Sequence, residues 1–472
     1  METGELATLL AELAGRHRVT GAQVVLHQRN RTVGAVFGEE THGSGRKVTG
    51  HSAFRLGSLT KPFTATLAMI LVEGGDVGLD VPLGEYLPEV GPPAPGADRA
   101  MTLRQLLSHT SGLVSAIDEQ AAMTAVRSRW VAENCREADL AHPAGTVFSY
   151  SNVGYALIGH LVERITGMDW WEAVDTILLG PLEIDAPFGH ASRAATGRPI
   201  ATGHTVHAAS GRVLPVEHLL PAVGAPNGGL SLSAEDLVRF ARMHLGDPEV
   251  TPLLDPVTAK GMRQDELANL AVGSFGMADG WGLGWASYRG SGTEWFGHDG
   301  TSDGSSCHLR FDPADGTVIA LTTNTGTGPA MWEDLVAALR GSGIEVGNYP
   351  LSALAEPAPT VPGPAECAGR YVNGLMEFVI TGDPGGGFFL SLGGEPHSAL
   401  TFHPGLRFTM RELGGGRMSY VGRFLRDGTT GRIDLIQVTG RLARRFPDPP
   451  SEDLRLPAMA GTDRYGRQGP HS

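Results

Sequence analysis

Residues 53–75 read AFRLGSLTKPFTATLAMILVEGG, and this stretch decides the interpretation of the whole chain. The apolar run after Lys61 predicts a buried helix that ends at Gly74 and Gly75. Ser58 falls at the start of this helix, and Lys61 follows three residues later on the same face. The positive N-terminus of a helix favours negative charge on the Ser58 oxygen and disfavours a protonated Lys61. The segment therefore predicts a serine nucleophile that is activated by an amine base.

Lysine is rare in this chain, because Lys47, Lys61 and Lys260 are the three lysines among 37 basic residues. Arginine keeps its proton in proteins, whereas a buried lysine can lose it and serve as a base. The Ser-x-x-Lys spacing occurs again at Ser44 and Lys47, in the glycine-rich segment HGSGRKVTG, which we interpret as a surface turn. The alternative for Ser58 is a helix N-cap with Lys61 as a solvated residue of the first turn.

A second segment, residues 143–167, reads PAGTVFSYSNVGYALIGHLVERITG. Its turn-rich start leads through Tyr150 and Asn152 into a predicted helix with apolar residues at helical spacing. The two side chains lie in a loop at the helix start and are able to point the same way. A tyrosine beside a lysine could be held as a phenolate and act as the base. The alternative is an ordinary tyrosine that packs at a helix entrance.

A third segment, residues 292–326, alternates like two central antiparallel strands and begins with His298-Asp299-Gly300. Its glycines permit the close approach of a substrate backbone. The backbone N–H of Thr301 could pair with that of Ser58 as an oxyanion hole. The alternative is an ordinary His-Asp-Gly turn.

Together and in this order, the three segments resemble the serine β-lactamase and penicillin-binding-protein superfamily. The resemblance covers roughly residues 15–345, and the histidine of His298-x-Gly300 is typical of the branch that holds class C-like carboxypeptidases, D-aminopeptidases and esterases. It implies an α/β sandwich, in which an antiparallel sheet carries helices and a helical lobe lies across the cleft. Three further segments support it: LRQLLSHTSGL (103–113), NGGLSLSAEDLVRF (227–240) and GWGLGW (280–285).

The resemblance also implies a role for each matching residue. Ser58 would be acylated, and Lys61 and Tyr150 would relay protons. Asn152 would bind the amide that flanks the scissile carbonyl, and His298 would line the site and help to hold Tyr150. The amides of Ser58 and Thr301 would form the oxyanion hole beside Gly300, and His109 would be structural.

The C-terminal third predicts separate units. Residues 1–347 form the expected catalytic domain, and residues 348–366, with five prolines, read as a linker. Residues 367–449 alternate with period two and predict a small antiparallel barrel that resembles the lipocalin-like domain of some class C-like members. Residues 450–472 are expected to form a disordered tail.

The last predicted strand of this barrel carries arginines. Ile436, Val438, Gly440, Leu442, Arg444 and Phe446 would share one face if the segment were one strand. A buried Arg444 would need a partner, either an internal carboxylate or a substrate carboxylate gripped by its guanidinium. Arg441 and Arg445, on the opposite face, are further candidates.

The composition narrows the possible partners and compartment. The net charge of −14 and the absence of a Lys/Arg block disfavour nucleic acid and anionic membranes. Cys135, Cys307 and Cys367 show no disulfide or metal-ligand spacing, and we expect no metal or cofactor. The N-terminus has glutamates where a signal peptide needs positive charge, and no apolar run is long enough for a membrane span. We therefore expect a cytoplasmic protein.

A cytoplasmic member needs a substrate other than the cell wall. The penicillin-binding-protein-type thioesterases match this layout: they take a nonribosomal peptide, usually with a D-residue at its C-terminus, from a carrier-protein thioester onto the serine. Attack by the peptide's own N-terminal amine then releases a head-to-tail ring. The alternatives are a cytoplasmic D-aminopeptidase, carboxypeptidase or esterase of the same superfamily, or a binding protein on an inactive scaffold. The oligomeric state is not predicted.

Overall fold

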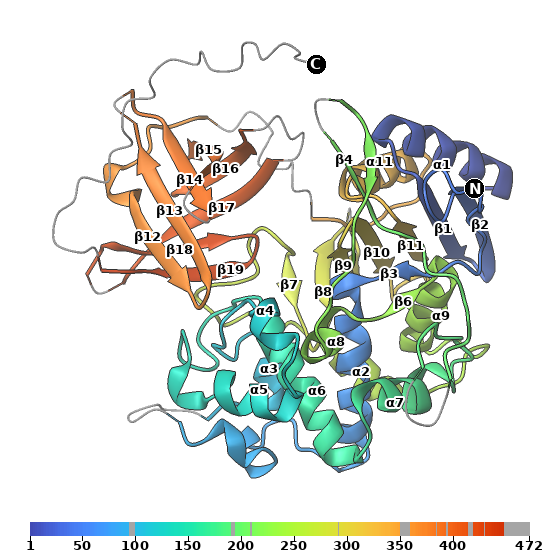
Figure 1. Ribbon diagram of the computed structural model, residues 1–472, viewed down its shortest axis with the longest axis horizontal. Coiled ribbons are helices and arrows are strands. Elements are labelled where there is room, and N and C mark those ends of the chain that lie inside the picture. The colour runs from blue at the N-terminus through green and yellow to red at the C-terminus, as the bar shows by residue number, and fades with distance from the viewer. Residues whose placement is uncertain are drawn as a thin grey trace, which may run out of the picture.

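The computed structural model describes residues 1–93, 100–189, 194–207, 210–290, 292–349, 359–383, 385–392, 395–413, 419–428 and 430–447. These residues form two parts: a sandwich of sheet and helices, and a closed barrel beside it (Figure 1). The last element of the sandwich along the chain is a long helix. The predicted tail at 450–472 and residues 350–358 of the predicted linker lie outside the described residues.

An antiparallel seven-stranded sheet forms the centre of the sandwich. Helices α1 (Thr3–His17) and α11 (Gly328–Gly341) cover one of its faces, and α9 (Ala234–Leu245) packs on the other. Because both faces are covered, the central strands are buried on both sides, and the α/β sandwich is confirmed. The strand order is β2 (Arg31–Gly38), β1 (Gly21–Gln28), β11 (Val318–Thr323), β10 (Ser305–Phe311), β9 (Glu294–Ser302), β8 (Ala286–Arg289) and β7 (Gly280–Trp281).

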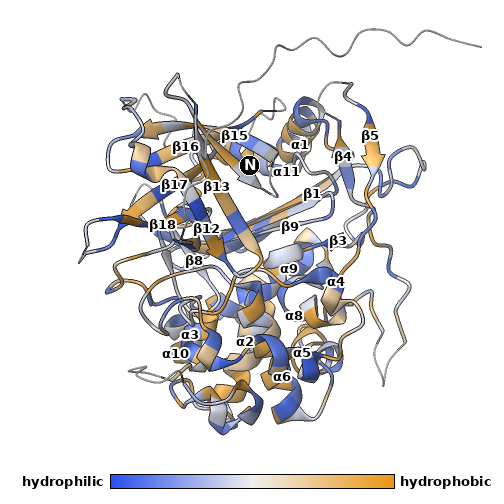
Figure 2. Cartoon of the chain, turned by 60° about the vertical axis from the view of Figure 1, so that its left-hand side comes forward, coloured by the Kyte–Doolittle hydropathy of each residue, from blue (hydrophilic) through white to orange (hydrophobic). Residues whose placement is uncertain are grey.

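A helical lobe packs below this sheet around α2 (Thr60–Glu73) (Figure 2). Every side chain of α2 from Thr60 to Met69 is buried, as expected of a helix that is apolar on all sides. Two-stranded sheets of β3 (Phe54–Arg55) with β6 (Ser231–Leu232) and of β4 (His204–Val206) with β5 (Val213–Pro215) complete the sandwich. The other helices are α3 (Leu103–Leu107), α4 (Glu119–Ala122), α5 (Arg127–Asn134), α6 (Asn152–Thr166), α7 (Trp170–Ala173), α8 (Ala225–Gly228) and α10 (Pro256–Gly261).

Eight antiparallel strands close into a barrel in chain order, which confirms the predicted small antiparallel barrel. Its interior is filled by aromatic and aliphatic side chains, and among them Phe402 stacks on Phe424. The strands are β12 (Gly369–Asn373), β13 (Met376–Gly382), β14 (Phe388–Leu392), β15 (Glu395–His403), β16 (Arg407–Glu412), β17 (Ser419–Arg426), β18 (Ile433–Val438) and β19 (Arg441–Arg445).

The prediction of one continuous strand through Ile436–Phe446 is wrong. The chain reverses at Thr439 and Gly440, whose φ angles are 44° and 72°, and β18 pairs back onto β19. Two positive φ angles define a tight hairpin turn that matches the twist of the strands. A β-branched threonine rarely adopts positive φ, so Thr439 does not signal the turn in the sequence. The reversal resets the alternation, and Arg444 therefore does not share a face with Ile436.

The β18–β19 hairpin attaches the barrel to the sandwich. The Gly440 carbonyl accepts a hydrogen bond from the Tyr150 amide (3.1 Å), and the Gly440 amide donates to the Phe275 carbonyl (3.0 Å). A side chain at position 440 would collide with Met277. Asn373 joins the two parts a second time, since its Oδ1 accepts from the Ser115 amide at 2.7 Å. The barrel is thus seated directly on the loop that carries Tyr150.

Candidate active site

Ser58 lies in a turn of 3₁₀ helix, Gly57–Leu59, that leads directly into α2. Two glycines allow this turn to pack closely against strand β9. Gly57 has a φ of 52°, and a side chain there would collide with the Thr301 carbonyl. A side chain at Gly300 would likewise collide with the Leu56 carbonyl. The backbones around Ser58 and Thr301 therefore meet, as an oxyanion hole built from their amides requires.

Lys61 is completely buried one turn into α2. Its Nζ lies 3.1 Å from Ser58 Oγ and donates to the Asn227 carbonyl at 3.0 Å. Burial, and then the positive charge of Arg441, lower the pKa of Lys61 well below its usual range. A neutral amine within hydrogen-bond distance of a serine hydroxyl is competent to accept its proton.

Tyr150 precedes the N-terminus of α6, where Ser151 caps the helix by accepting from the Gly154 amide. Lys61 Nζ lies 5.0 Å from the centroid of the Tyr150 ring. Burial raises the pKa of Tyr150 to about 12. The structure therefore favours a neutral phenol at Tyr150 over the phenolate considered from the sequence.

His298 lies on β9 with its ring centroid 6.3 Å from that of Tyr150. Its Nδ1 lies 2.6 Å from the Asp299 carbonyl, which only accepts, so Nδ1 carries the proton and Nε2 keeps a lone pair. Burial, and then the charge of Lys61, lower the pKa of His298 to about 3. His298 is therefore a neutral hydrogen-bond acceptor toward the site.

Buried polar atoms without a hydrogen-bond partner gather here, judged over the part of the chain that the structure describes. They are Tyr150 Oη, His298 Nε2, Asn152 Oδ1 and Asn227 Nδ2. Leaving such an atom unpaired costs about 1–3 kcal/mol. Tyr150, His298 and Asn227 surround the Ser58–Lys61 pair, so their unpaired atoms mark a place where a bound substrate would pair with them.

The strand edge next to His298 is open. Strand β8 pairs with β9 only from Glu294 to Gly297, so His298–Ser302 has no strand on that side within the described residues. A free strand edge accepts an extended peptide through backbone hydrogen bonds. The site thus has a place for a peptide beside the nucleophile.

The sequence analysis missed the residues that hold β9 in place. The Asp299 carboxylate binds Arg310 through both oxygens (2.9 and 2.8 Å) and His308 through Nδ1 (2.6 Å). Although burial opposes it, these two groups hold the pKa of Asp299 below its usual range. Arg310 was the available signal, because it lies in a predicted central strand, where a buried charge needs a partner.

His109 supports the Tyr150 loop, in keeping with the structural role expected of it. Its Nδ1 accepts from the Ser151 amide at 3.1 Å, and its ring lies 4.3 Å from that of Tyr150, centroid to centroid. Burial and then the charge of Lys61 lower its pKa well below the usual range, so it is neutral.

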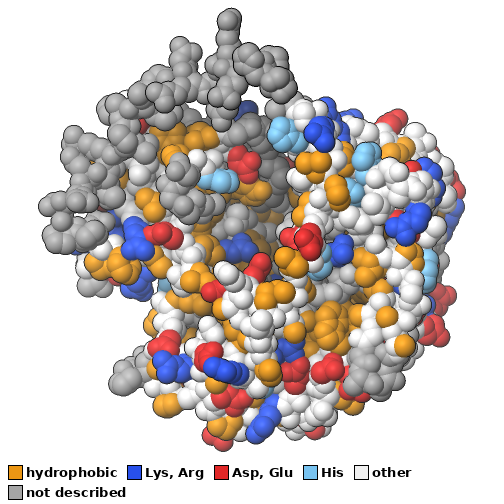
Figure 3. Space-filling model, in the orientation of Figure 1, with side chains coloured by type: hydrophobic (Ala, Val, Ile, Leu, Met, Phe, Trp, Pro, Cys, Tyr) orange, Lys and Arg blue, Asp and Glu red, His pale blue; other side chains and the backbone are white. Residues whose placement is uncertain are grey.

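The barrel contributes Arg441, not Arg444, to this site. The Arg441 guanidinium lies 5.0 Å from the centroid of the Tyr150 ring. Arg444 is exposed, and Arg445 binds the Tyr371 hydroxyl inside the barrel at 2.5 Å. Of the three arginines considered from the sequence, the hairpin turn brings only Arg441 to the nucleophile. Figure 3 shows the surface hollowed between barrel and sandwich, with a basic side chain inside the hollow.

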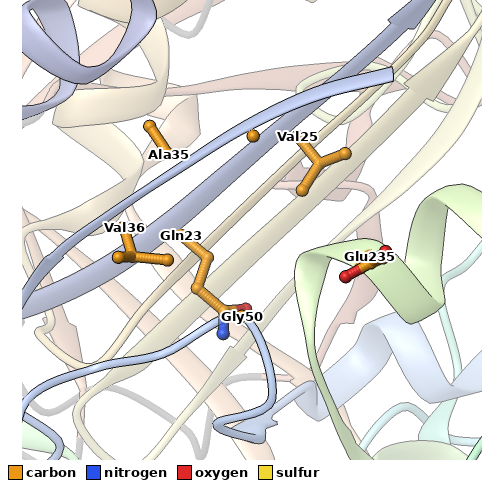
Figure 4. A pocket seen from close by; sticks show the side chains of 7 residues that line it. Gln23, Val25, Ala35, Val36, Gly50 and Glu235 are labelled. Carbon is orange, nitrogen blue, oxygen red and sulfur yellow. The ribbon is translucent and has the colours of Figure 1, made fainter. Parts of the chain in front are cut away.

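A separate depression of about 250 Å³ lies at the edge of the sheet (Figure 4). The Gln23 amide at its floor is already bonded to the carbonyls of Thr49 and Ser52. None of the residues that line this depression is a nucleophile, and we assign no chemistry to the depression. Its lining residues are Gln23, Val25, Gly34, Ala35, Val36, Gly50 and Glu235.

Within the described ranges, no group of three or more His, Cys, Asp or Glu side chains has the arrangement of a metal site. None of the helices that the structure describes combines the length and apolar character that a membrane crossing requires.

Comparison with known proteins places the sandwich in a family. Residues 6–340 match the model of the family described as Beta-lactamase. Penicillin-binding protein 4 of Amycolatopsis lactamdurans is 34% identical over 366 residues, which cover 76% of this chain and 94% of that protein.

Solved structures extend the likeness into the barrel. SurE is 36% identical with a TM-score of 0.81, over 94% of this chain and 99% of SurE. A second structure, of SurE with D-Leu, has the same coverage and identity and a TM-score of 0.78. A D-stereospecific amidohydrolase from Streptomyces sp. is 25% identical with a TM-score of 0.55, over 70% of this chain and 97% of the amidohydrolase.

Proposed function

The chain belongs to the Beta-lactamase family, and from this premise we propose that it is a peptide-cyclising acyltransferase. It takes a peptide with a D-residue at its C-terminus from a carrier-protein thioester onto Ser58. It then releases the peptide as a head-to-tail macrolactam. The family supports a serine hydrolase or acyltransferase in general, and the thioester substrate and the cyclisation are our proposal.

Acylation follows from the placement of Lys61 and Tyr150. The neutral Lys61 amine accepts the Ser58 proton as Oγ attacks the thioester carbonyl, and the amides of Ser58 and Thr301 stabilise the oxyanion. As the C–S bond breaks, the Tyr150 phenol protonates the leaving sulfur. The proton held by Lys61 then passes to Tyr150, which restores both groups and leaves the peptidyl ester on Ser58.

Release runs through the same groups in reverse. The N-terminal amine of the bound peptide attacks the Ser58 ester, and Lys61 and Tyr150 accept the amine proton and return one to Ser58 Oγ. His298 Nε2, a lone-pair acceptor without a partner among the described residues, is available to orient an N–H donor of the substrate. Asn152 would bind the amide that flanks the acyl carbonyl, while the open edge at Gly300 would align the peptide backbone.

The observation that carries the proposal is the attachment of the barrel to the catalytic loop. Gly440 accepts from the Tyr150 amide, and Arg441 lies over the Tyr150 ring. The likeness to SurE, which covers 94% of the chain, includes this second part. The D-Leu in one SurE structure and the D-stereospecificity of the Streptomyces amidohydrolase support a D-residue at the acyl position.

The test offers a linear peptide thioester with a C-terminal D-residue and follows the products by mass spectrometry. A product lighter than the linear acid by one water is expected from the wild type. The L-epimer should react poorly, and Ser58→Ala should be inactive. Hydrolysis alone across a range of such peptides would rule out the cyclase.

Hydrolysis is the second candidate, and the match to the amidohydrolase favours it, because 97% of that enzyme aligns with this chain. A D-aminopeptidase, carboxypeptidase or esterase would use the same acylation, with water as the second nucleophile. The ratio of cyclic to linear product from one substrate separates the two functions directly.

A further inference from the structure

A row of side chains crosses the outer face of the barrel from the hairpin that contacts Tyr150. Strand pairing aligns Leu442 with Gln437, Gln437 with Arg423, Arg423 with Arg407, and Arg407 with His403. Directly paired residues on antiparallel strands point to the same face. That face is the outer one, because the residues that alternate with them fill the barrel: Phe402, Phe408, Phe424, Ile436 and Ala443.

The inner end of the row is fixed to the sandwich. The Leu442 amide donates to Ser149 Oγ at 3.2 Å, one residue before Tyr150, and Gln437 Nε2 donates to the Gly273 carbonyl at 2.8 Å. Neighbouring strands lie about 4.8 Å apart, so Arg423 lies roughly 10 Å and Arg407 roughly 14 Å from Leu442. The row therefore leads away from the active site, and the spacing of the strands gives the distance of each residue from Leu442.

The two arginines at the centre of the row form an unfavourable pair. Like charges directly opposite each other on paired strands are destabilising. Arg423 uses its Nε to donate to Gln437 Oε1 (2.9 Å), and Arg407 uses its Nε to donate to the Pro404 carbonyl (3.1 Å). The Arg423 guanidinium is held 4.8 Å from the centroid of the Phe275 ring. Within the described ranges, the terminal nitrogens of both forks lack hydrogen-bond partners, and neither arginine has a carboxylate in ion-pair distance.

His403 adds a buried donor beside this pair. It is 6% exposed, and its Nε2 lies 3.2 Å from Thr409 Oγ1. Its Nδ1 is buried and has no partner among the residues that are described. A buried ring nitrogen without a partner is costly, and His403 is paired across the strands with Arg407, which has no acidic partner within the described ranges. One bound anion would reduce the repulsion between the two arginines. It would also pair with their terminal nitrogens and with His403 Nδ1.

We propose that Arg407, Arg423 and His403 bind the phosphate of the phosphopantetheine arm that delivers the thioester. This inference rests on the proposed function. Guanidinium forks grip phosphate oxygens bidentately, and an imidazole N–H adds a third donor. Residues 369–446 hold ten arginines against six acidic residues in a chain of net charge −14, so the barrel is the part suited to an anion.

The length of the arm fits the row. From phosphate to sulfur, an extended phosphopantetheine is as long as four to five extended residues, roughly 15 Å. Tyr150 protonates the leaving sulfur, so the arm departs on the side that the hairpin closes. A phosphate at Arg423 and Arg407 would then place the sulfur beside Tyr150, and the row would hold the thioester in register for attack by Ser58.

Binding measurements test the site without turnover. We compare 4′-phosphopantetheine with pantetheine by calorimetry and expect the phosphorylated compound to bind about 10-fold more tightly, as charge-assisted hydrogen bonds predict. Arg407→Gln should remove this preference, and so should Arg423→Gln. The matched control is Arg432→Gln, an exposed arginine on the same barrel, which should keep it. Equal affinities in the wild type, or a preference that survives both variants, would overturn the assignment.

Turnover separates this inference from the proposed function. A peptidyl phosphopantetheine thioester should have a KM about 10-fold below that of the same peptidyl pantetheine thioester. In the Arg407→Gln variant, the two KM values should be equal. If neither thioester reacts while the binding preference holds, the proposed function fails and the phosphate site stands. If both react with equal KM, the phosphate site fails and the cyclase stands. If the variants weaken only the binding of an intact carrier protein, the row is a protein-docking surface and our assignment is wrong.

Discussion

The chain contains the spacing Ser-x-x-Lys twice, and the two occurrences have opposite surroundings. Lys47 is 74% exposed at its side chain and pairs with Glu39 at 3.1 Å, while Ser44 Oγ donates to the Thr41 carbonyl. Lys61 is fully buried, contacts Ser58, and has no ion-pair partner among the described carboxylates. The spacing alone thus specifies nothing: burial and the charge of the neighbours make one lysine a base and leave the other a solvated cation.

The largest expected effect comes from replacing each of the two serines by alanine in turn. Ser58→Ala removes the nucleophile, so covalent labelling by a fluorophosphonate should vanish and turnover should fall by at least about 10³-fold. Ser44→Ala should leave both unchanged. Labelling that survives in Ser58→Ala would place the nucleophile elsewhere.

Replacing each lysine by arginine tests which of them acts as a base. Arginine stays protonated, so Lys61→Arg should lower kcat/KM by about 10²–10⁴-fold, the usual contribution of a general base. Lys47→Arg keeps the surface charge and should behave as wild type. Equal activities of the two variants in steady-state assays would contradict the assignment of Lys61.

The charge of Arg441 should contribute, after burial, to the pH at which Lys61 works. Burial and Arg441 both lower the pKa of Lys61, and the rate is lost as the pH falls through that pKa because protonated Lys61 accepts no proton. Arg441→Gln should raise this pKa, shift the acidic limb of the kcat/KM profile to higher pH, and reduce the rate on that limb by up to about 10-fold.

The matched control for this variant is Arg444→Gln, which removes an exposed charge from the same strand and should leave the profile in place. An unshifted profile in Arg441→Gln would show that the barrel does not tune the amine.

The smallest effect concerns stability. The pKa of Lys61 is lower in the folded than in the unfolded state, so the unfolded chain binds more protons and the free energy of unfolding decreases as the pH falls. Lys61→Met removes this buried amine and should stabilise the fold by roughly 1–3 kcal/mol. The gain should be larger at pH 6 than at pH 8, as measured by urea unfolding. Lys47→Met should change neither value.

Much of the sandwich and its site could be predicted from the sequence because the determining interactions are local. Ser58 and Lys61 are three residues apart, on a 3₁₀ turn and the helix that continues it, and Tyr150 and Asn152 adjoin the cap of another helix. The apolar run of α2 and the alternation of the barrel strands identify each element without knowledge of its neighbours.

What the sequence analysis missed depends on contacts between distant segments. Arg441 was passed over in favour of Arg444, because a turn with positive φ at Thr439 reverses the strand and threonine gives no sign of it. Asp299 was overlooked because its partners Arg310 and His308 lie on the next strand, and only the register of β9 with β10 brings them together.

Through the hairpin turn at Thr439 and Gly440, the appended domain adds a charge that lowers the pKa of the Lys61 amine further than burial alone does. The nucleophile and base are encoded within four consecutive positions, whereas the cation that tunes them arrives on a short loop some 380 residues later. Related enzymes could therefore diverge in working pH by changing this loop alone, with their chemistry left intact. For protein engineering, grafting residues 437–442 between relatives is a compact way to retune the reaction without touching the active-site helix.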